Sequence, residues 1–593
     1  MDTPLDGSRT ILDELGPLRV YLKRYRLRLV LGVLCQLFST GLAMIVPWLT
    51  KNAIDGLINH LPFSRIREIA LAILGANIAL GLFLFLMRWF IITTSRFAEY
   101  DLRNDLYTHL AALPRGFYDR FSTGDLMSRL TNDLNAVRML LGPAILQSSN
   151  TIFYLIFALF MLITIDPLLT AIAMAILLVL PFVVYRISRL VRVRSERVQE
   201  GLADINTHAQ ENLNGMRVVK SYNLEQGQSR GMAALSARYR DLNLALVRVQ
   251  ALFFPLMLTI SGIASILVLF FGGRFVILRR ITIGELVAFM SYLTMLTWPM
   301  FAIGWVISMA QRGAASMRRI NVILREQPVP EPNAPMEPDF NADPVVRFEH
   351  VDFRYAPDRP LVLKDVSLTI KRGEVVALMG LTGAGKSTLA HLLSKTYAPD
   401  RGTVYLFGAP LQQIATSRLR RHIGMVPQEI TLFSDTIQEN IAFGVAETSR
   451  DSLLSAAELA HFAPDVQDLP LGYETLLGER GINLSGGQKQ RLTLARAILP
   501  DPELLILDDP FSSVDISTEE SILDRFDAIR GSGTRTVIII SHRVNTARRA
   551  DRIIMLHGGT VVEDGPHHRL RKSGGLYQDM YERQQLEEEL SRM

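Results

Sequence analysis

The sequence predicts two domains of different class, an α-helical membrane domain in the first half and an α/β domain in the second. Three observations support this division: long uncharged apolar stretches end by Ala310, a proline-rich segment follows them, and alternating strand-like and helix-like segments fill the remainder. The chain has 593 residues, 49% of them hydrophobic, and a positive mean hydropathy. It is therefore long enough for both domains and more apolar than a soluble protein of its size.

The composition excludes several classes of site. A net charge of +5 is small for this length, so it does not favour a nucleic-acid partner. Cys35, the only cysteine, lies in an apolar run, which excludes an intrachain disulfide and a cysteine metal site. The first eight residues are polar and carry acids, so no signal peptide is expected.

About six apolar stretches are each about 19 residues or longer, enough for a helix to cross a hydrocarbon core of ~30 Å. A buried helix of a soluble protein could explain one such stretch, but not six in one half of a chain. Asp166-Pro167 alone separates the third from the fourth, which predicts a tight helical hairpin there. The stretches are Leu29–Thr50, Ile69–Met87, Leu140–Ile165, Pro167–Tyr185, Ala251–Gly273 and Leu286–Ala310.

Basic residues predict the orientation of these spans. Arginines and lysines cluster before the first span and after the fourth, and such clusters face the cytoplasm. Arg274, Arg279 and Arg280 would then face outward, but the other clusters outnumber them. We therefore expect a multi-pass protein of the inner (plasma) membrane, with everything after Gln311 in the cytoplasm. The polar segments after spans two and four predict helices that continue beyond the bilayer, and the external connections are short.

Prolines alternate with acidic residues between Arg325 and Pro344, which predicts a semi-rigid extended linker. The expected organisation is a membrane domain over residues 1–325, a linker over 326–344, the α/β domain over 345–580 and a helical tail over 581–593.

The second half of the sequence contains a predicted phosphate-binding loop. Residues 380–388 contain the pattern G-x-x-x-x-G-K-[ST], between the apolar run Val375–Met379 and the helix-like Thr388–Leu393. An ordinary glycine turn would not place Lys and Ser at the required offset. Glycine lets backbone N–H groups surround phosphates, and a helix N-terminus favours anions. The predicted nucleotide-binding residues of this loop are Gly380, Gly383, Ala384, Gly385, Lys386, Ser387 and Thr388.

Two further motifs follow in the same domain. The buried-strand run Leu504–Asp508 ends in a carboxylate that would hold Mg²⁺ opposite the Ser387 hydroxyl. In Leu484–Arg491, Ser485 is predicted as a helix N-cap, and Gly486 and Gly487 let the backbone approach an anion closely. A capped helix with a flexible start would explain these residues equally well in isolation.

The whole string L-S-G-G-Q-x-Q-R is the signature of the ATP-binding cassette (ABC) family, which this chain resembles over nearly its whole length. The resemblance implies a membrane α-helical domain of ABC exporter type fused to an α/β P-loop NTPase (ABC ATPase) domain. It also implies that ATP binds between the phosphate loop of one subunit and the signature of another, here Ser485, Gly486, Gly487 and Gln488. A chain with one such domain is then a half-transporter that works as a dimer.

The same resemblance assigns roles to residues that mean little alone. Tyr355 would stack on adenine, and Gln428 would sense Mg²⁺ and the attacking water while touching the membrane domain. Residues 478–481 would contact coupling helices, and Asp515 lies in the loop that crosses the dimer interface. His542 would contact the γ-phosphate. A strand tyrosine otherwise commonly packs in a core, and a histidine after a strand is otherwise incidental.

The membrane half is similar to the multidrug and lipid exporters of this family. Phe117–Asp133 and Gly215–Tyr222 resemble the two cytoplasmic coupling regions, and Trp298–Met300 resembles a motif of the sixth span. Side chains that could line a promiscuous cavity could equally pack between helices or face lipid; they are Phe253, Met257, Met295 and Trp298.

One position departs from the family pattern. The family has Glu directly after the Asp that ends the strand run Leu504–Asp508, whereas this chain has Asp509 at that position. Asp is one methylene shorter, which matters for a base that must sit within hydrogen-bond reach of water. We hypothesise that this chain's own phosphate loop, with Lys386, Gln428, Asp509 and His542 as catalytic residues, forms the slowly hydrolysing site of a heterodimer. A homodimer in which Asp509 serves adequately is the alternative.

The expected function is ATP-driven export of amphipathic substrates, such as drugs or lipids, by alternating access. The cofactors are ATP and Mg²⁺, and the partners are a second ABC half-transporter, the substrate and membrane lipids. Alternatives are a homodimeric flippase with two equivalent sites, a regulatory half that binds ATP without useful turnover, and an ATP-gated channel. An importer is disfavoured because importers usually carry spans and ATPase on separate chains.

Overall fold

The computed structural model describes residues 11–332, 334–478, 481–514, 516–530 and 535–592. Contacts within these residues divide the chain into two compact units. Unit 1 contains residues up to 111 together with 123–326, and unit 2 contains residues 112–122 together with those from 327 onward. A short segment from between two spans therefore belongs to the same compact unit as the second half of the chain.

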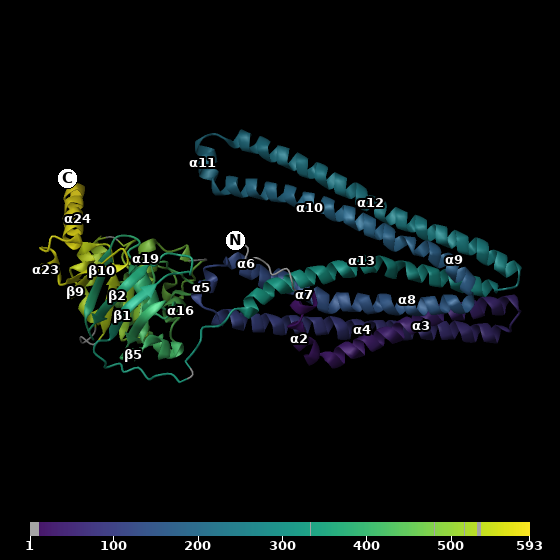
Figure 1. Cartoon of the computed structure of the whole chain (residues 1–593), viewed down its shortest axis with the longest axis horizontal. Coiled ribbons are helices and arrows are strands. Elements are labelled where there is room, and N and C mark those ends of the chain that lie inside the picture. The colour runs from purple at the N-terminus through teal and green to yellow at the C-terminus, as the bar shows by residue number, and fades with distance from the viewer. Residues whose placement is uncertain (1–10, 333, 479–480, 515, 531–534, 593) are drawn as a thin grey trace. The chain divides into compact units, whose positions relative to one another are not determined.

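In its described residues unit 1 consists of helices joined by short turns, and the prediction of six spans is confirmed there by six helical runs long and apolar enough to cross a membrane. Four of these runs are built on single helices: α3 (Arg26–Ile58), α4 (Phe63–Ala112), α12 (Glu225–Ile277) and α13 (Ile283–Arg325). The third run joins α6 (Thr123–Ser128), α7 (Leu134–Met139) and α8 (Ile145–Ile165) through π-helical turns, and the fourth joins α9 (Pro167–Leu177) to α10 (Val179–Asn214) (Figure 1). Short helices complete the unit: α1 (Ile11–Glu14), α2 (Leu18–Arg24) and α11 (Met216–Ser221).

Two helices of unit 1 are longer than a bilayer crossing requires. Helix α4 has 50 residues and α12 has 53. At 1.5 Å per residue each is roughly 75–80 Å long, more than twice the ~30 Å hydrocarbon core. The predicted hairpin is also present: Asp166 alone separates α8 from α9, and its carboxylate accepts the N–H of Leu169 at 2.8 Å.

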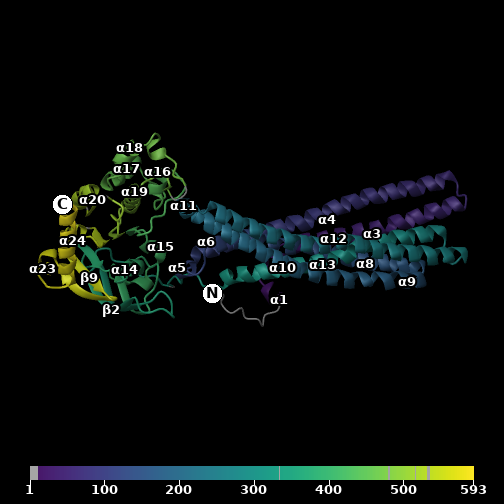
Figure 2. The ribbon, with the colours of Figure 1, turned by 90° about the horizontal axis from the view of Figure 1, so that it is seen from above.

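The core of unit 1 lies where α8, α9, α10, α12 and α13 meet. Tyr292 is fully buried there, and its hydroxyl donates to the Met44 carbonyl at 2.7 Å. Helices α10 and α12 lie side by side along their length in both views (Figures 1 and 2). Toward α11 they diverge from α13 (Figure 1).

Unit 2 is built on two sheets, and their order explains where a ligand can bind. The six-stranded sheet has the order β10-β9-β3-β8-β7-β6, in which only the β10–β9 pair is antiparallel, and the four-stranded antiparallel sheet has the order β2-β1-β4-β5. The strands are β1 (Val346–Phe353), β2 (Leu363–Ile370), β3 (Val375–Gly380), β4 (Arg401–Leu406), β5 (Ala409–Pro410), β6 (Ile423–Val426), β7 (Leu504–Asp508), β8 (Thr536–Ile540), β9 (Arg552–His557) and β10 (Thr560–Gly565).

Helices surround these sheets. They are α5 (Arg115–Tyr118), α14 (Lys386–Leu393), α15 (Thr416–Leu419), α16 (Ile437–Ala442), α17 (Arg450–Leu459), α18 (Ala463–Gln467), α19 (Gly486–Ile498), α20 (Ile516–Asp524), α21 (Phe526–Arg530), α22 (Val544–Ala547), α23 (His567–Leu570) and α24 (Leu576–Arg592).

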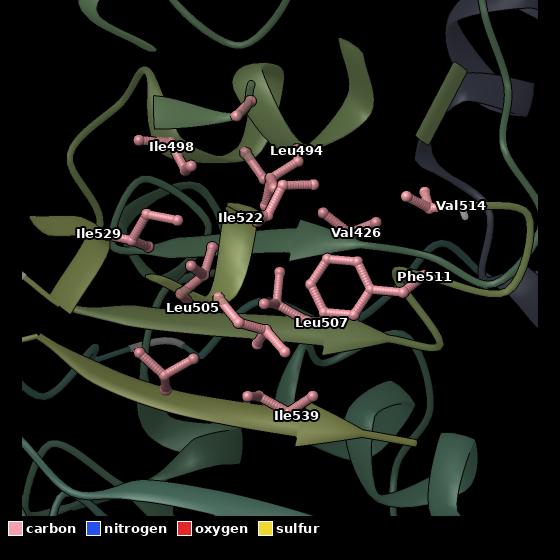
Figure 3. Packing of buried hydrophobic residues seen from close by; sticks show 14 of the residues in the cluster. Val426, Leu494, Ile498, Leu505, Leu507, Phe511, Val514, Ile522, Ile529 and Ile539 are labelled. Atoms are coloured by element: carbon pink, nitrogen blue, oxygen red, sulfur yellow. The ribbon is translucent and has the colours of Figure 1, made fainter. Parts of the chain in front are cut away.

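Two apolar layers hold the six-stranded sheet. On one face, Leu494 and Ile498 of α19 pack over Leu505, Leu507 and Ile539 of the sheet (Figure 3). On the other face, α14 and the four-stranded sheet bury the remaining side chains of β3, β7 and β8. Strands buried on both faces are typical of a parallel sheet covered by helices, and ligands bind such sheets at the carboxyl ends of the strands.

Candidate nucleotide-binding site

The carboxyl ends of three parallel strands meet at one edge of the six-stranded sheet. Strand β8 lies between β3 and β7, and Ile540 pairs with Leu378 on one side and Asp508 on the other. The loops that leave β3, β7 and β8 therefore start next to one another, although they are far apart in the sequence.

The loop after β3 has a backbone that only glycine accommodates at two points. Gly380 has φ +145°, and a Cβ there would stand 2.2 Å from the Leu556 carbonyl oxygen. Gly385 has φ +101° as the N-cap of α14, and a Cβ there would stand 2.7 Å from a methyl group of Leu363. Glycine adopts these conformations without a steric cost, so the strand turns tightly into the N-terminus of α14.

The Lys386 side chain folds back along this loop. Its ammonium donates to the carbonyls of Gly380 at 2.9 Å and Leu381 at 3.0 Å. Burial lowers the pKa of Lys386, while the carboxylates of Asp508 and Asp509 act in the opposite direction. Partial burial strengthens the attraction between this cation and an anion placed in the loop.

Asp508 ends β7 with its side chain buried and facing Ser387. The Ser387 hydroxyl donates to Asp508 Oδ1 at 3.1 Å, and burial raises the pKa of the carboxyl. In the described residues no group of three or more His, Cys, Asp or Glu could hold a metal ion. One carboxylate and one hydroxyl instead fit Mg²⁺, which usually takes one or two protein ligands together with phosphate oxygens and water.

Asp509 and His542 face each other across the next two loops. Asp509 Oδ1 lies 3.3 Å from His542 Nδ1, with 19% of the Asp509 side chain and 58% of the His542 side chain exposed. Asp509 has φ +52°, and its N–H donates to the Ile540 carbonyl at 2.9 Å. Asp tolerates this left-handed conformation better than most residues.

These side chains line one cavity of about 570 Å³. The structure thus brings together most of the residues that the sequence proposed for nucleotide, metal and catalysis: Tyr355, Gly383, Gly385, Lys386, Ser387, Thr388, Gln428, Asp508, Asp509 and His542. Gly380 and Ala384 are buried within the loop and do not line the cavity.

Tyr355 lies at the cavity beside α14. Its hydroxyl is 3.0 Å from Thr388 Oγ1, and its ring packs edge-on against Tyr397 with 5.1 Å between centroids. The side chain is held by these contacts although 42% of the residue is exposed. An aromatic fixed at the edge of a cavity suits stacking on a flat base.

The signature residues Ser485, Gly486, Gly487 and Gln488 do not line this cavity. As expected, Ser485 caps α19: its hydroxyl accepts the Gln488 N–H at 3.3 Å, and the Gln488 side chain accepts the Ser485 N–H at 2.9 Å. Asp515, Glu479 and Arg480, which the sequence places in contact regions, lie outside the described residues.

Gln490 belongs to the signature string Leu484–Arg491, but the string does not predict the contacts that its side chain makes. Its amide donates to Ser512 Oγ at 2.6 Å and accepts the Ser513 N–H at 3.0 Å. A Cβ on Gly487 would stand 3.1 Å from the Ser513 carbonyl oxygen. The start of α19 is therefore bonded to the loop that follows Asp509.

Residues 112–122 reach a neighbouring cavity of unit 2. Asp119 accepts a short hydrogen bond from the Tyr397 hydroxyl, and Phe117 is fully buried. Arg115 and Asp119 line a cavity of about 960 Å³ together with Tyr355, Ser387 and Asp508. The segment that resembles a coupling region thus shares a cavity wall with nucleotide-site residues.

Unit 1 has a cavity of its own, of about 880 Å³, lined by α10, α12 and α13. Of the four side chains proposed for a substrate cavity, Phe253 lines it. Met257 is 1% exposed in the core of unit 1, and Met295 packs against the same core. Trp298 does not line this cavity and is 67% exposed on α13.

Known proteins match both halves of the chain. Residues 29–300 match the family described as ABC transporter transmembrane region, and residues 363–512 match the family described as ABC transporter. Over 583 residues the chain is 35% identical to YheI of Bacillus subtilis, a probable multidrug resistance ABC transporter ATP-binding/permease protein, covering 97% of this chain and 98% of that protein. It is 32% identical over 577 residues to a putative multidrug export ATP-binding/permease protein of Staphylococcus aureus, covering 95% and 99%.

A solved structure agrees with this assignment. A bacterial Atm1-family ABC exporter with ATP bound matches with a TM-score of 0.77 at 27% identity, covering 95% of this chain and 98% of that one. Relatives of this similarity over almost the full length share both the fused domain order and the fold. The chain therefore belongs to the exporter-type ABC transporters that join a transmembrane region to an ATP-binding domain, and it is a multi-pass membrane ATPase whose nucleotide-binding domain lies in the cytoplasm.

Proposed function

We propose that this chain is one half of a dimeric ABC exporter that moves amphipathic substrates, and that its own phosphate loop forms the slower of two ATP sites. The observation that carries the proposal is the single cavity in which Lys386, Asp508, Asp509 and His542 converge while the signature lies elsewhere. A site built this way needs the signature of a second subunit to cover its nucleotide.

The side chains of the cavity have separable tasks in this proposal. Lys386 exchanges two loop carbonyls for phosphate oxygens, which are stronger acceptors. Ser387 and Asp508 would hold Mg²⁺, which would supply positive charge to the phosphates. Asp509 orients the attacking water, Gln428 contributes to the same task, and His542, beside Asp509, contacts the γ-phosphate.

ATP drives transport in this scheme only by favouring one conformation. A ligand shifts an equilibrium by its differential affinity for the two states, so ATP must bind the closed pair of ATPase domains more tightly than the open pair. Residues 112–122 belong to unit 2 and are continuous with α4 and α6. Closure is therefore transmitted to the spans along the chain itself.

The cavity of unit 1 supports an amphipathic substrate. Ile187, Phe253 and Trp305 give it apolar and aromatic surface, which is typical of sites that accept varied apolar groups. The same cavity carries charges of both signs, contributed by Arg192, Glu196, Glu200 and Arg312. Such a lining fits a molecule with an apolar body and a polar or charged end.

The proposal is tested by Lys386→Ala in the full-length protein reconstituted in vesicles. Loss of a preorganised cation at the phosphates is expected to lower ATP hydrolysis at least ~10²-fold and to abolish ATP-dependent movement of an amphipathic dye. Lys364→Ala, on an exposed position of β2, is the matched control and should behave as wild type.

Other outcomes point to other functions. Nucleotide binding and dye movement both unaffected by Lys386→Ala would overturn the proposal. Dye movement that follows its gradient and never opposes it would indicate an ATP-gated channel. ATP binding without turnover in any assembly would indicate a regulatory half, a candidate that the short Asp509 side chain favours.

A further inference from the structure

A side chain of helix α24 is hydrogen-bonded to the backbone of the loop that carries His542. Gln584 of α24 donates from Nε2 to the His542 carbonyl at 2.6 Å, and its Oε1 accepts the Val544 N–H at 2.8 Å. One amide thus fixes the backbone on both sides of Arg543. Helix α22, which begins at Val544, has no side-chain cap from its own N-cap residue, and Gln584 supplies that acceptor.

Helix α24 is anchored firmly enough to act as a support. Tyr577 in its first turn is fully buried, its hydroxyl lies 2.6 Å from His567 Nδ1, and its N–H donates to the Glu563 carboxylate at 3.2 Å. Gln584 follows seven residues later, roughly 10 Å along the helix. It is half-buried, whereas its neighbour Gln585 is exposed.

The rest of the loop is held by polar contacts. Arg543 donates to the buried carboxylate of Glu519, and Thr546 Oγ1 donates to the same carboxylate at 2.6 Å. A cavity of about 370 Å³ flanks the loop on this side, lined by Glu519, His542, Arg543 and Gln584 among others. Hydrogen bonds therefore hold the loop on the side of this cavity, while Val544 and Ala547 of α22 pack into the apolar core.

The imidazole itself has little support of its own. The His542 side chain is 58% exposed and faces Asp509 at 3.3 Å. Its place at the cavity wall follows from the backbone, and the backbone carbonyl of the same residue is the one that Gln584 binds. A displacement of about 1 Å at a catalytic group can cost about 100-fold in rate.

We propose that Gln584 is a positioning residue for ATP hydrolysis, which holds the backbone of His542 so that the imidazole meets the γ-phosphate. The proposal rests on the role of His542 in the proposed function. Through this amide, the anchoring of α24 sets the hydrolysis rate although the helix contributes no side chain to the nucleotide cavity.

The two hydrogen bonds of the Gln584 side chain require a group that both donates and accepts. An amide both donates and accepts, whereas the carboxylate of Gln584→Glu could accept from Val544 but would face the His542 carbonyl with a second acceptor. Gln584→Ala removes both bonds. Gln585→Ala is the matched control, since Gln585 bonds to Tyr581 at 2.8 Å on the same helix and does not touch the loop.

The experiment measures single-turnover ATP hydrolysis by the full-length protein, together with KM for ATP, thermal stability and amide hydrogen exchange. Gln584→Glu and Gln584→Ala are expected to lower the hydrolysis rate between about 10- and 100-fold with KM changed less than about twofold. Exchange should accelerate in residues 541–546 and stay unchanged in the phosphate loop. Gln585→Ala should match wild type in every measurement.

A double-mutant cycle with His542→Ala separates positioning from general damage. If Gln584 acts through His542, Gln584→Ala should cause no further loss in the His542→Ala background. The same fold-loss in both backgrounds, or an equal loss in Gln585→Ala, would overturn the proposal. A full rate in His542→Ala would overturn the role assigned to His542, and this proposal with it.

Discussion

Asp509 illustrates how far one residue constrains the chemistry. Its backbone is held at φ +52° and bonded to Ile540, so the length and rotamer of the side chain determine where its carboxylate ends. That carboxylate lies 3.3 Å from His542. Glu would reach one methylene further toward a water on the γ-phosphate. A left-handed backbone costs residues other than Gly, Asn and Asp about 1–2 kcal/mol, so the substitution should also reduce stability slightly.

At this scale we predict that Asp509→Glu raises ATP hydrolysis by the purified chain about 10-fold or more, because a better-placed base recovers part of the ~10²–10⁴-fold that general base catalysis supplies. Asp509→Asn is the control and should lower the residual rate. Steady-state ATPase per folded molecule is the measurement. Brisk hydrolysis by a homodimer of the unmodified chain, unimproved by Glu, would contradict the slow-site hypothesis.

At the scale of elements, the cavity lined by residues of α5 and α14 contains a titratable group. His391 lies near the Tyr355 hydroxyl and the Tyr397 ring, and Arg115 and Asp119 are the charged groups that face it. Burial lowers the pKa of His391, Arg115 lowers it further, and Asp119 acts in the opposite direction. Because the folded pKa lies below the unfolded value, this histidine contributes stability above about pH 6.5 that is lost as the pH falls.

We therefore predict that acidification from about pH 7.5 to about pH 5.5 lowers the melting temperature of the wild-type protein more than that of His391→Asn, since Asn cannot take up the proton. Thermal unfolding of the detergent-solubilised protein at several pH values is the measurement. Equal slopes for wild type and His391→Asn would refute the prediction.

Elements with local signals could be predicted from the sequence, and contacts between distant segments could not. Strand β7, the start of α14 and the cap of α19 follow from a few adjacent residues. Gln584 carries no such signal, because its partners His542 and Val544 are about 40 residues away. The same limit explains Met257, whose burial depends on which face of α12 meets its neighbours.

At the scale of the whole molecule, six spans and one ATPase domain make half of an exporter. Span number and domain order could be predicted because hydropathy and proline content vary over tens of residues. The division into compact units could not, since residues 112–122 lie between two spans in the sequence but contact the ATPase fold.

Because residues 112–122 belong to unit 2, each half of the sequence contributes to that unit. The backbone N–H of Val329 in the linker donates to the Ala112 carbonyl, and the Tyr397 hydroxyl donates to Asp119. A short segment from the first half of the chain is therefore hydrogen-bonded to the second half. Severing the linker by an inserted protease site should therefore leave two fragments that copurify in detergent. The double variant Tyr397→Phe, Phe117→Ala should copurify less. If the fragments of the cut wild-type protein separate as readily as those of the double variant, residues 112–122 do not hold the two fragments together.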